Sequence, residues 1–72
     1  MAFAIYGESL GYVHLIASDD SESAVAKFVT DIESVGVSLK DVYNVTAVEN
    51  LRQDTDLEDR VRKLIREARD AQ

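Results

Sequence analysis

The 72-residue sequence contains no cysteine, no proline and no tryptophan, and His14 is its only histidine. The absence of cysteine excludes disulfides and thiolate metal sites, and it is typical of proteins from reducing compartments. The N-terminal residues lack a basic leader, and no apolar run approaches the roughly 20 residues that span a bilayer. We therefore predict a cytoplasmic protein with no membrane partner, no bound metal and no cofactor.

The chain is long enough for one domain only. A domain of this size buries only about 60% of the surface that its unfolded chain exposes, so its core is thin. Without disulfides, packing alone is expected to supply roughly 3–5 kcal/mol of stability. We predict that residues 1–72 form a single small α+β domain, and a homodimer is one way for it to gain stability.

Basic residues are scarce in the first part of the chain. Residues 1–51 contain eight acids and two lysines, a net charge of −6, whereas residues 52–72 contain six acids and six bases. An acidic surface repels the phosphate backbone, which normally supplies much of the affinity for nucleic acids. The charge therefore disfavours direct nucleic-acid binding and favours a larger protein or protein complex with a basic surface as partner.

Two apolar runs near the N-terminus predict a β-hairpin. Residues 2–6 and 12–17 flank the segment 7–11, which has glycine at both ends and is expected to form a five-residue loop. Pairing Tyr6 with Tyr12 separates two faces. The predicted core face carries Phe3, Ile5, Val13, Leu15 and Ala17, and the other face carries Ala4, Tyr6, Tyr12, His14 and Ile16.

The rest of the chain predicts helix, strand and helix. Residues 20–35 repeat apolar side chains at three-four spacing, which predicts a helix that ends at Gly36. Residues 41–49 alternate apolar and polar residues as a strand does, with Tyr43, Val45 and Ala47 facing the helix. A right-handed crossover would make this strand parallel to the second one. It is placed beside the first strand, antiparallel to it, because the first strand is short and almost uncharged, as a central strand tends to be. The predicted fold is therefore β-β-α-β-α, a three-stranded antiparallel sheet of order 2-1-3 with helix 20–35 on one face.

The last predicted element is a helix over residues 56–70. Thr55 and Glu58 have the spacing of a capping box, and an apolar stripe follows. Glu58 and Arg62 are expected to form one of several exposed ion pairs at i,i+4 spacing. Arg62, Arg66 and Arg69 share one side of this helix, where they suit either contact with phosphate or acidic protein, or a solvated face.

Acidic residues at the first helix form one candidate partner-binding site. Asp19, Asp20 and Glu22 have the residue types of a helix N-terminus, and capping is their ordinary interpretation. They lack the spacing of a calcium loop. Glu33 lies eleven residues after Glu22, nearly in line with it on a helix. Because Glu33 is too far away to cap the same end, we predict that these four residues form an acidic edge that contacts a partner.

Tyr6, Tyr12 and His14 form the second candidate, because the predicted register places them together on the sheet face away from the first helix. Aromatic side chains are enriched in binding surfaces. The alternative is that the C-terminal helix covers this face. No serine or cysteine accompanies His14 in a recognisable motif, so no catalytic residues are predicted and the protein is expected not to be an enzyme.

The segment from Tyr12 to Ala24, YVHLIASDDSESA, is followed by an amphipathic helix and by Val42-Tyr43-Asn44-Val45. This layout resembles that of small phage-encoded proteins, which include anti-CRISPR proteins and inhibitors of host RNA polymerase. The resemblance covers about residues 11–48 and assigns no role to any single residue. It implies stoichiometric, non-enzymatic binding to a host complex, often through an acidic surface that competes with nucleic acid. A self-associating structural or regulatory module, with a strand edge or the aromatic face as its interface, is the alternative.

Overall fold

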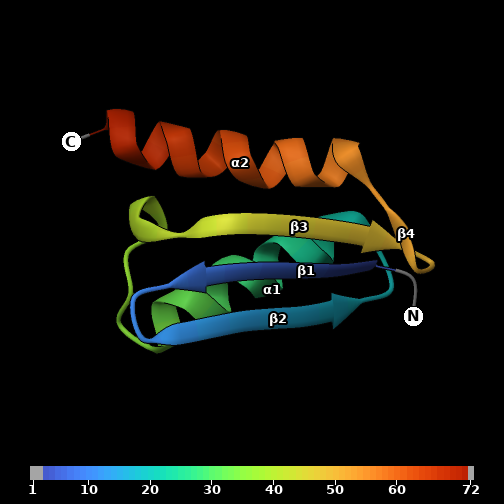
Figure 1. Ribbon diagram of the computed structural model, residues 1–72, viewed down its shortest axis with the longest axis horizontal. Helices are drawn as coiled ribbons and strands as arrows, with labels where there is room; N and C mark the ends of the chain where they lie inside the picture. Colours follow the sequence, from blue (N-terminus) through green and yellow to red (C-terminus); the bar gives the residue numbers. More distant parts are fainter. Residues whose placement is uncertain (1–2, 72) are drawn as a thin grey trace.

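The computed structural model describes residues 3–71 and shows an α+β fold with an antiparallel sheet and two helices, as predicted (Figure 1). In chain order its elements are β1 (Phe3–Ser9), β2 (Tyr12–Ser18), α1 (Ser21–Ser34), the 3₁₀ turn η1 (Leu39–Asp41), β3 (Tyr43–Glu49), β4 (Arg52–Gln53) and α2 (Thr55–Asp70).

The sheet has four strands in the order β2-β1-β3-β4, so the predicted count of three is wrong, although the order of the first three strands agrees. The additional strand, β4, has only two residues and pairs antiparallel with the end of β3. Asn50 and Leu51 connect them, and both have positive φ, 51° and 69°. Two such residues form a tight hairpin turn that usually contains glycine. Because Leu51 stands where a glycine is usual, the sequence carries no signal of this turn.

The β1–β2 hairpin has a different register from the one predicted. Tyr6 pairs with Leu15, and Ser9 pairs with Tyr12, so the loop consists of Leu10 and Gly11 alone. The predicted pairing of Tyr6 with Tyr12 is therefore displaced by three residues. Because side chains alternate along a strand, an odd displacement moves every β2 side chain to the opposite face. The start of the predicted first strand, at Ala2, lies outside the described residues.

Gly7 explains why the hairpin is longer than predicted. It lies inside β1 and not in the loop, and among the glycines of the hairpin only Gly11 has positive φ, at 86°. A Cβ atom at Gly7 would lie 2.6 Å from the ζ carbon of Phe28. Real Cβ atoms do not approach other atoms that closely, so a glycine is required beneath the ring of Phe28 in α1. Gly7 therefore does not mark a turn; its lack of a side chain allows Phe28 to pack against β1.

Both helices contribute to one buried cluster with the sheet. Val61 and Ile65 of α2 belong to the same buried cluster as Phe28 and Ile32 of α1. In Figure 1, α1 lies behind β1 and β2, and α2 runs alongside β3. The buried cluster consists of Ile5, Ala24, Phe28, Ile32, Val42, Val45, Ala47, Leu57, Val61 and Ile65.

An irregularity in β3 changes the side chains that reach this core. Val45 and Ala47 are buried as predicted, but Tyr43 is exposed. Asn44 has positive φ, 55°, and the pairing of β1 with β3 shifts between Tyr6 and Glu8. This bulge turns Tyr43 to the opposite face and lets Val42 enter the core.

Capping residues set the ends of the two helices. Asp20 is the N-cap of α1, and its carboxylate accepts hydrogen bonds from the Ser23 backbone N–H at 2.7 Å and the Ser23 hydroxyl at 3.0 Å. Gly36, with φ of 76°, follows the helix end as predicted. The N-cap of α2 is Asp54, which accepts from the Leu57 N–H at 3.0 Å, so the predicted capping box beginning at Thr55 is one residue late.

Candidate interaction edge

The outer edge of β2 is open. The sheet order places β2 at one end, and within residues 3–71 no strand pairs with its outer side. In an antiparallel ladder only every second residue of an edge strand bonds to its neighbour, so the other residues of β2 direct N–H and C=O groups outward. β2 is seven residues long and contains no Lys, Asp, Glu or Pro, the residues that usually protect an edge. The outer edge of β2 therefore has the features of an edge that can pair with a further strand.

The sheet face opposite the helices is also open and largely apolar. Val13 and Leu15 are each 68% exposed on β2, and Tyr43 is exposed on β3. Figure 1 shows β1, β2 and β3 in front of α1, and no helix of the described chain lies in front of them. The alternative that the C-terminal helix covers this face is therefore not met, because α2 packs against β3 and η1 and contributes to the buried cluster on the other side.

A shallow groove follows β2 on the helix side. Ile16 and Ala17 form its floor, and α1 forms its wall with Lys27 and Asp31. The other lining residues, Ala26, Thr30 and Ser34, are small. The β2 edge is thus flanked by apolar side chains on the open face and by a groove with one positive and one negative side chain on the other.

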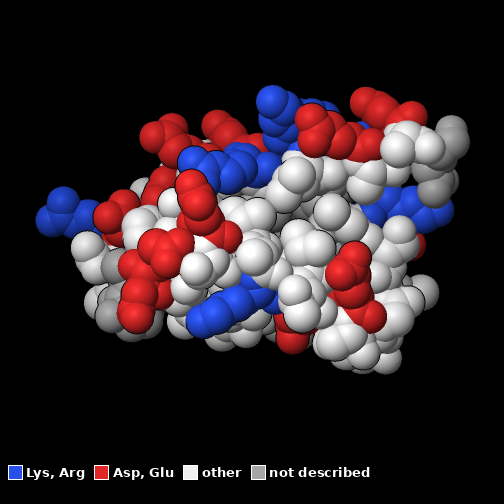
Figure 2. Space-filling view, turned by 180° about the vertical axis from the view of Figure 1, so that it is seen from behind, with Lys and Arg blue, Asp and Glu red and all other residues white. Residues whose placement is uncertain are grey.

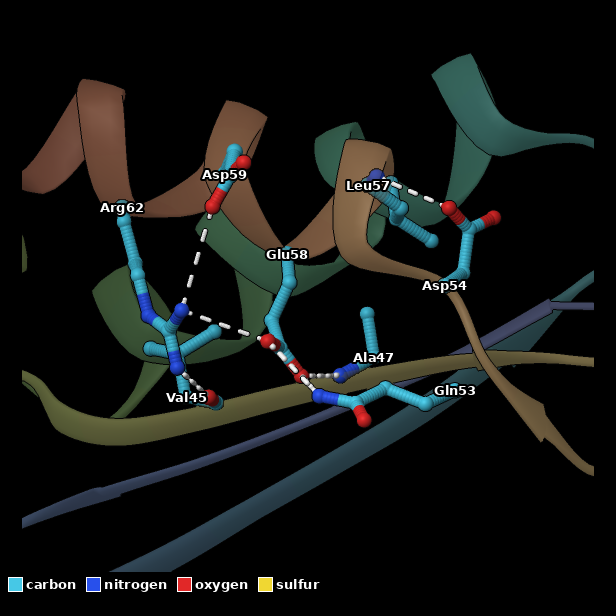
Figure 3. Close-up of polar contacts among 8 residues, drawn as sticks. All are labelled: Val45, Ala47, Gln53, Asp54, Leu57, Glu58, Asp59 and Arg62. Carbon is cyan, nitrogen blue, oxygen red and sulfur yellow. Dashed lines mark hydrogen bonds and ion pairs between the residues drawn. The ribbon is translucent and has the colours of Figure 1, made fainter.

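The opposite edge of the sheet, at β3, is closed by side chains of α2. Glu58 is 3% exposed, and its carboxylate accepts from the Ala47 backbone N–H at 3.1 Å (Figure 3). Gln53 also donates to this carboxylate, at 3.3 Å and 3.2 Å. A buried carboxylate is stable only with such partners. Glu58 therefore takes the place of a neighbouring strand, and the prediction that it is an exposed surface residue is wrong.

Two arginines continue this closure along β3. Arg62 pairs with Glu58 at 3.2 Å and donates to the Val45 carbonyl at 2.9 Å. Arg69 donates to the carbonyls of Lys40 at 2.8 Å and Val42 at 3.3 Å. Neither of the two roles considered for this row, anion contact or a purely solvated face, includes these bonds. Arg62 and Arg69 hydrogen-bond the backbone of β3 and of the segment before it.

A polar network lies beneath β2. The Ser9 Oγ atom is 2.7 Å from His14 Nε2, and His14 Nδ1 is 3.1 Å from Asp31 Oδ2. In the tautomer that satisfies both contacts, Nδ1–H donates to Asp31 and the Ser9 hydroxyl donates to Nε2. The sequence analysis found no serine companion for His14. The companion is Ser9, and it becomes visible only when the hairpin register is known.

This network has the connectivity of a Ser-His-Asp triad, but substrate cannot reach it. Ser9 and His14 are each 2% exposed. The ring of Tyr12 stacks on one side of His14, with centroids 6.1 Å apart, and Phe28 contacts it edge-on at 6.3 Å. A nucleophile needs space for a carbonyl carbon and for oxyanion donors beside it. The arrangement instead satisfies the polar atoms of a buried histidine and ties β2 to α1.

The acidic candidates do not lie together. Asp20 caps α1, Asp19 and Glu22 are exposed near it, and Glu33 is exposed toward the other end of the helix. Figure 2, which views the helix-covered side, shows acidic side chains in several separate groups with basic side chains among them. Asp19 and Asp20 thus precede the helix, Glu22 lies in its first turn, and Glu33 lies near its other end.

The aromatic candidates are divided between the two faces. Tyr6 lies on the open face, where partial burial and then the Glu8 carboxylate raise its pKa. His14 faces α1, and Tyr12 stacks against it. The predicted aromatic cluster is therefore wrong, because it depended on the displaced register. Val13 and Leu15 occupy the open positions on β2 instead.

Residues 3–71 include no group of three or more carboxylate or histidine side chains arranged to hold a metal ion, and none of their helices is long and apolar enough to cross a membrane. No protein-family model matches the chain, and neither the curated proteins nor the solved structures that were searched include a match.

Proposed function

We propose that this protein is a non-enzymatic interaction module that binds another polypeptide by adding a strand to its sheet at β2. The observation that carries this proposal is the difference between the two edges: α2 side chains bond the backbone of β3, whereas β2 directs its outward groups to solvent. Sheets with an exposed edge are a recurring means of peptide recognition, in which backbone bonds supply affinity.

The side chains next to the β2 edge would supply specificity. A strand paired with β2 places alternate side chains on the two sides of the sheet. On one side they meet Val13, Leu15 and Ala17, and on the other they enter the groove along Ile16. A partner segment of alternating apolar residues without clustered charge fits both sides.

A titration with a synthetic strand tests this proposal. The probe is a peptide that carries the sequence of residues 12–18 between short polar flanks, added to the ¹⁵N-labelled protein. We expect concentration-dependent amide shifts in β2 and in the residues lining the groove, and no comparable shifts in β3. Shifts that centre on β3 and β4, or no shifts at millimolar peptide, would refute strand addition at β2.

The acidic charge supports a second candidate, contact with a basic surface through α1. Glu22 and Glu33 are exposed, and residues 1–51 carry the whole net charge of −6. The resemblance to phage inhibitors would make that partner a nucleic-acid-binding surface of a host complex. A lysine-rich peptide is the probe: Glu33→Lys should weaken its binding at low salt, and Glu67→Lys on the neutral α2 segment should weaken it less. Equal effects would show that the net charge of the protein, and not the position of Glu33, determines binding of the peptide.

A further inference from the structure

Resting on the proposed strand addition, we infer that the strand received at β2 is the β2 strand of a second copy of this chain. The two strands pair antiparallel about a two-fold axis. The resulting dimer has one continuous eight-stranded sheet.

Charge is the first argument for this occupant. Two chains that each carry −6 repel one another, and they approach most easily where neither presents an acid. Residues 10–18 contain no acidic residue and no lysine or arginine. Asp19 and Asp20 follow directly after the strand. The outer edge of β2 is therefore the strip along which two copies can meet with the least repulsion.

Register is the second argument. With the axis at Leu15, the central residue of β2, Val13 of one chain lies opposite Ala17 of the other, and Leu15 lies opposite Leu15. These exposed side chains then form one apolar row across the axis, and such cross-strand pairs stabilise a sheet. In the same register Asp19 and Asp20 lie opposite the uncharged hairpin residues Gly11 and Leu10. No acid faces an acid along the paired strands.

The wall of the groove supplies a complementary charge pair. Lys27 and Asp31 both line the groove beside β2, and His14 contacts Asp31. The two-fold axis passes outside β2 at the level of Leu15, so α1 of one chain lies alongside α1 of the other and runs in the opposite direction. The two-fold rotation directs Lys27 of each chain toward the partner's Asp31. The small side chains of Ala26 and Thr30, on the same wall, allow the two helices to approach.

Closure is the last argument. Pairing β2 with a second β2 uses the open edge of both chains, and the two ends of the new sheet are the β3–β4 sides, which α2 already bonds through Glu58 and Arg62. When the open edges of two chains pair with each other, no open edge remains for a third subunit, and the assembly ends at two. A different strand would leave the sheet open at its new edge.

The mass in solution tests the inference. We expect the full chain to have twice its 8.0 kDa mass at about 1 mM in light scattering and to dissociate on dilution. Leu15→Lys places two lysines on the axis and should weaken the dimer by about 100-fold or more. Leu51→Lys is the matched control, because Leu51 is 92% exposed at the opposite side of the sheet, and it should leave the dimer unchanged. Circular dichroism checks that both variants fold.

A second pair of variants tests the helix contact without altering the strand. Lys27→Glu and Lys63→Glu change the net charge equally, so general repulsion rises by the same amount in both. Only Lys27 lies in the groove, and its substitution should weaken the dimer by about tenfold more than the control. Equal dissociation of these two variants, or a dimer that resists Leu15→Lys, would overturn the two-fold arrangement.

The inference and the proposed function fail in different ways. If the parent chain keeps its monomer mass at 1 mM while the strand peptide still shifts the β2 amides, the second copy is the wrong occupant and strand addition stands. If the peptide leaves β2 unchanged and the chain is monomeric, both are overturned. Amide exchange in β2 that slows with rising protein concentration, while exchange at Ala47 does not change, supports both.

Discussion

The two edges of this sheet differ in whether side chains bond their outward backbone N–H and C=O groups. Along β3, the carboxylate of Glu58 and the guanidinium group of Arg62 bond backbone groups that a further strand would otherwise bond, and Arg69 bonds the segment just before β3. Along β2, described residues supply no such side chain, and the strand itself carries no protecting charge. Natural sheets usually protect both edges. This difference between a protected and an open edge in one small sheet is the basis of the strand addition proposed at β2.

The same comparison explains the distribution of charge. The second part of the chain is electrically neutral because its six bases balance its six acids. These bases include Arg62 and Arg69, which bond the backbone of β3 and of the segment before it. The first part contains an uncharged edge strand followed by an acidic step. The overall charge of −6 therefore describes neither region, since one is strongly acidic and the other is neutral.

The largest effect is expected at the closed edge. Glu58→Ala leaves the Ala47 N–H without its acceptor and Arg62 without its buried partner, and should cost about 2–4 kcal/mol of unfolding free energy. Urea denaturation measures it, and amide exchange at Ala47 should accelerate. Glu67→Ala, at an exposed position of the same helix, is the control. If the two variants unfold at the same urea concentration, Glu58 does not protect this edge.

The second-largest effect on stability is expected at the polar network beneath β2. Ser9→Ala removes the hydroxyl that donates to His14 Nε2 and leaves a buried acceptor unpaired, at a cost of about 1–3 kcal/mol. Ser38→Ala is the comparison, because Ser38 is exposed and its side chain makes no capping bond. Denaturation of both variants at neutral pH decides the point. A Ser9 variant as stable as the Ser38 variant would mean that the network contributes nothing to folding.

A gain in stability is expected at the β3–β4 turn. Leu51 has a φ of 69°, a left-handed conformation that costs a residue with a side chain about 1–2 kcal/mol, whereas glycine adopts it freely. After the entropy loss of glycine, Leu51→Gly should raise the unfolding free energy by about 0.5–1 kcal/mol. The melting temperature should rise accordingly. Leu10→Gly, at an exposed loop leucine with negative φ, should give no increase, and a rise in both would point to exposed leucine as the cause.

The smallest effect concerns pH. The hydrogen bond from the Ser23 backbone, and then the one from its hydroxyl, lower the pKa of Asp20 below its ordinary value of 3.8. A carboxyl whose pKa is lower in the folded state stabilises the fold above the ordinary pKa and loses this contribution as pH falls through the folded value. Asp20→Asn keeps the cap but not the charge. The stability advantage of the parent should be present at pH 6 and disappear toward pH 2, and a constant difference over this range would contradict the assignment.

Much of the fold follows from local patterns in the sequence. The apolar spacing of residues 20–35 predicts α1, and the glycine at its end is found where expected. The order of the first three strands is predicted because the first strand is short and almost uncharged, as a central strand tends to be, and this order is observed. These features depend on neighbouring residues and on general geometry, so they can be inferred without the tertiary structure.

The errors arise where a residue has a role that only the tertiary structure reveals. Gly7 looks like a loop glycine, but it makes room for Phe28, and this single difference reverses the faces of β2. Glu58 looks like one half of a surface ion pair, but the shortness of β4 leaves the Ala47 N–H for it to bond. A strand edge is predicted as the interface of the alternative, self-associating module, but the side chains that flank each edge could not be assigned because they depend on the register.

The position of α2 in the chain has a consequence for folding during synthesis. β1, β2 and β3 all precede α2, so the ribosome completes the sheet before the helix that protects β3 exists. In that interval both edges are open, and nascent sheets with unpaired edges are prone to aggregate. A chain that stops before Thr55 should therefore polymerise through β3 as well as β2. In the proposed dimer, α2 is the element that keeps the assembly finite, because without it each chain would have two open edges and could form a fibre.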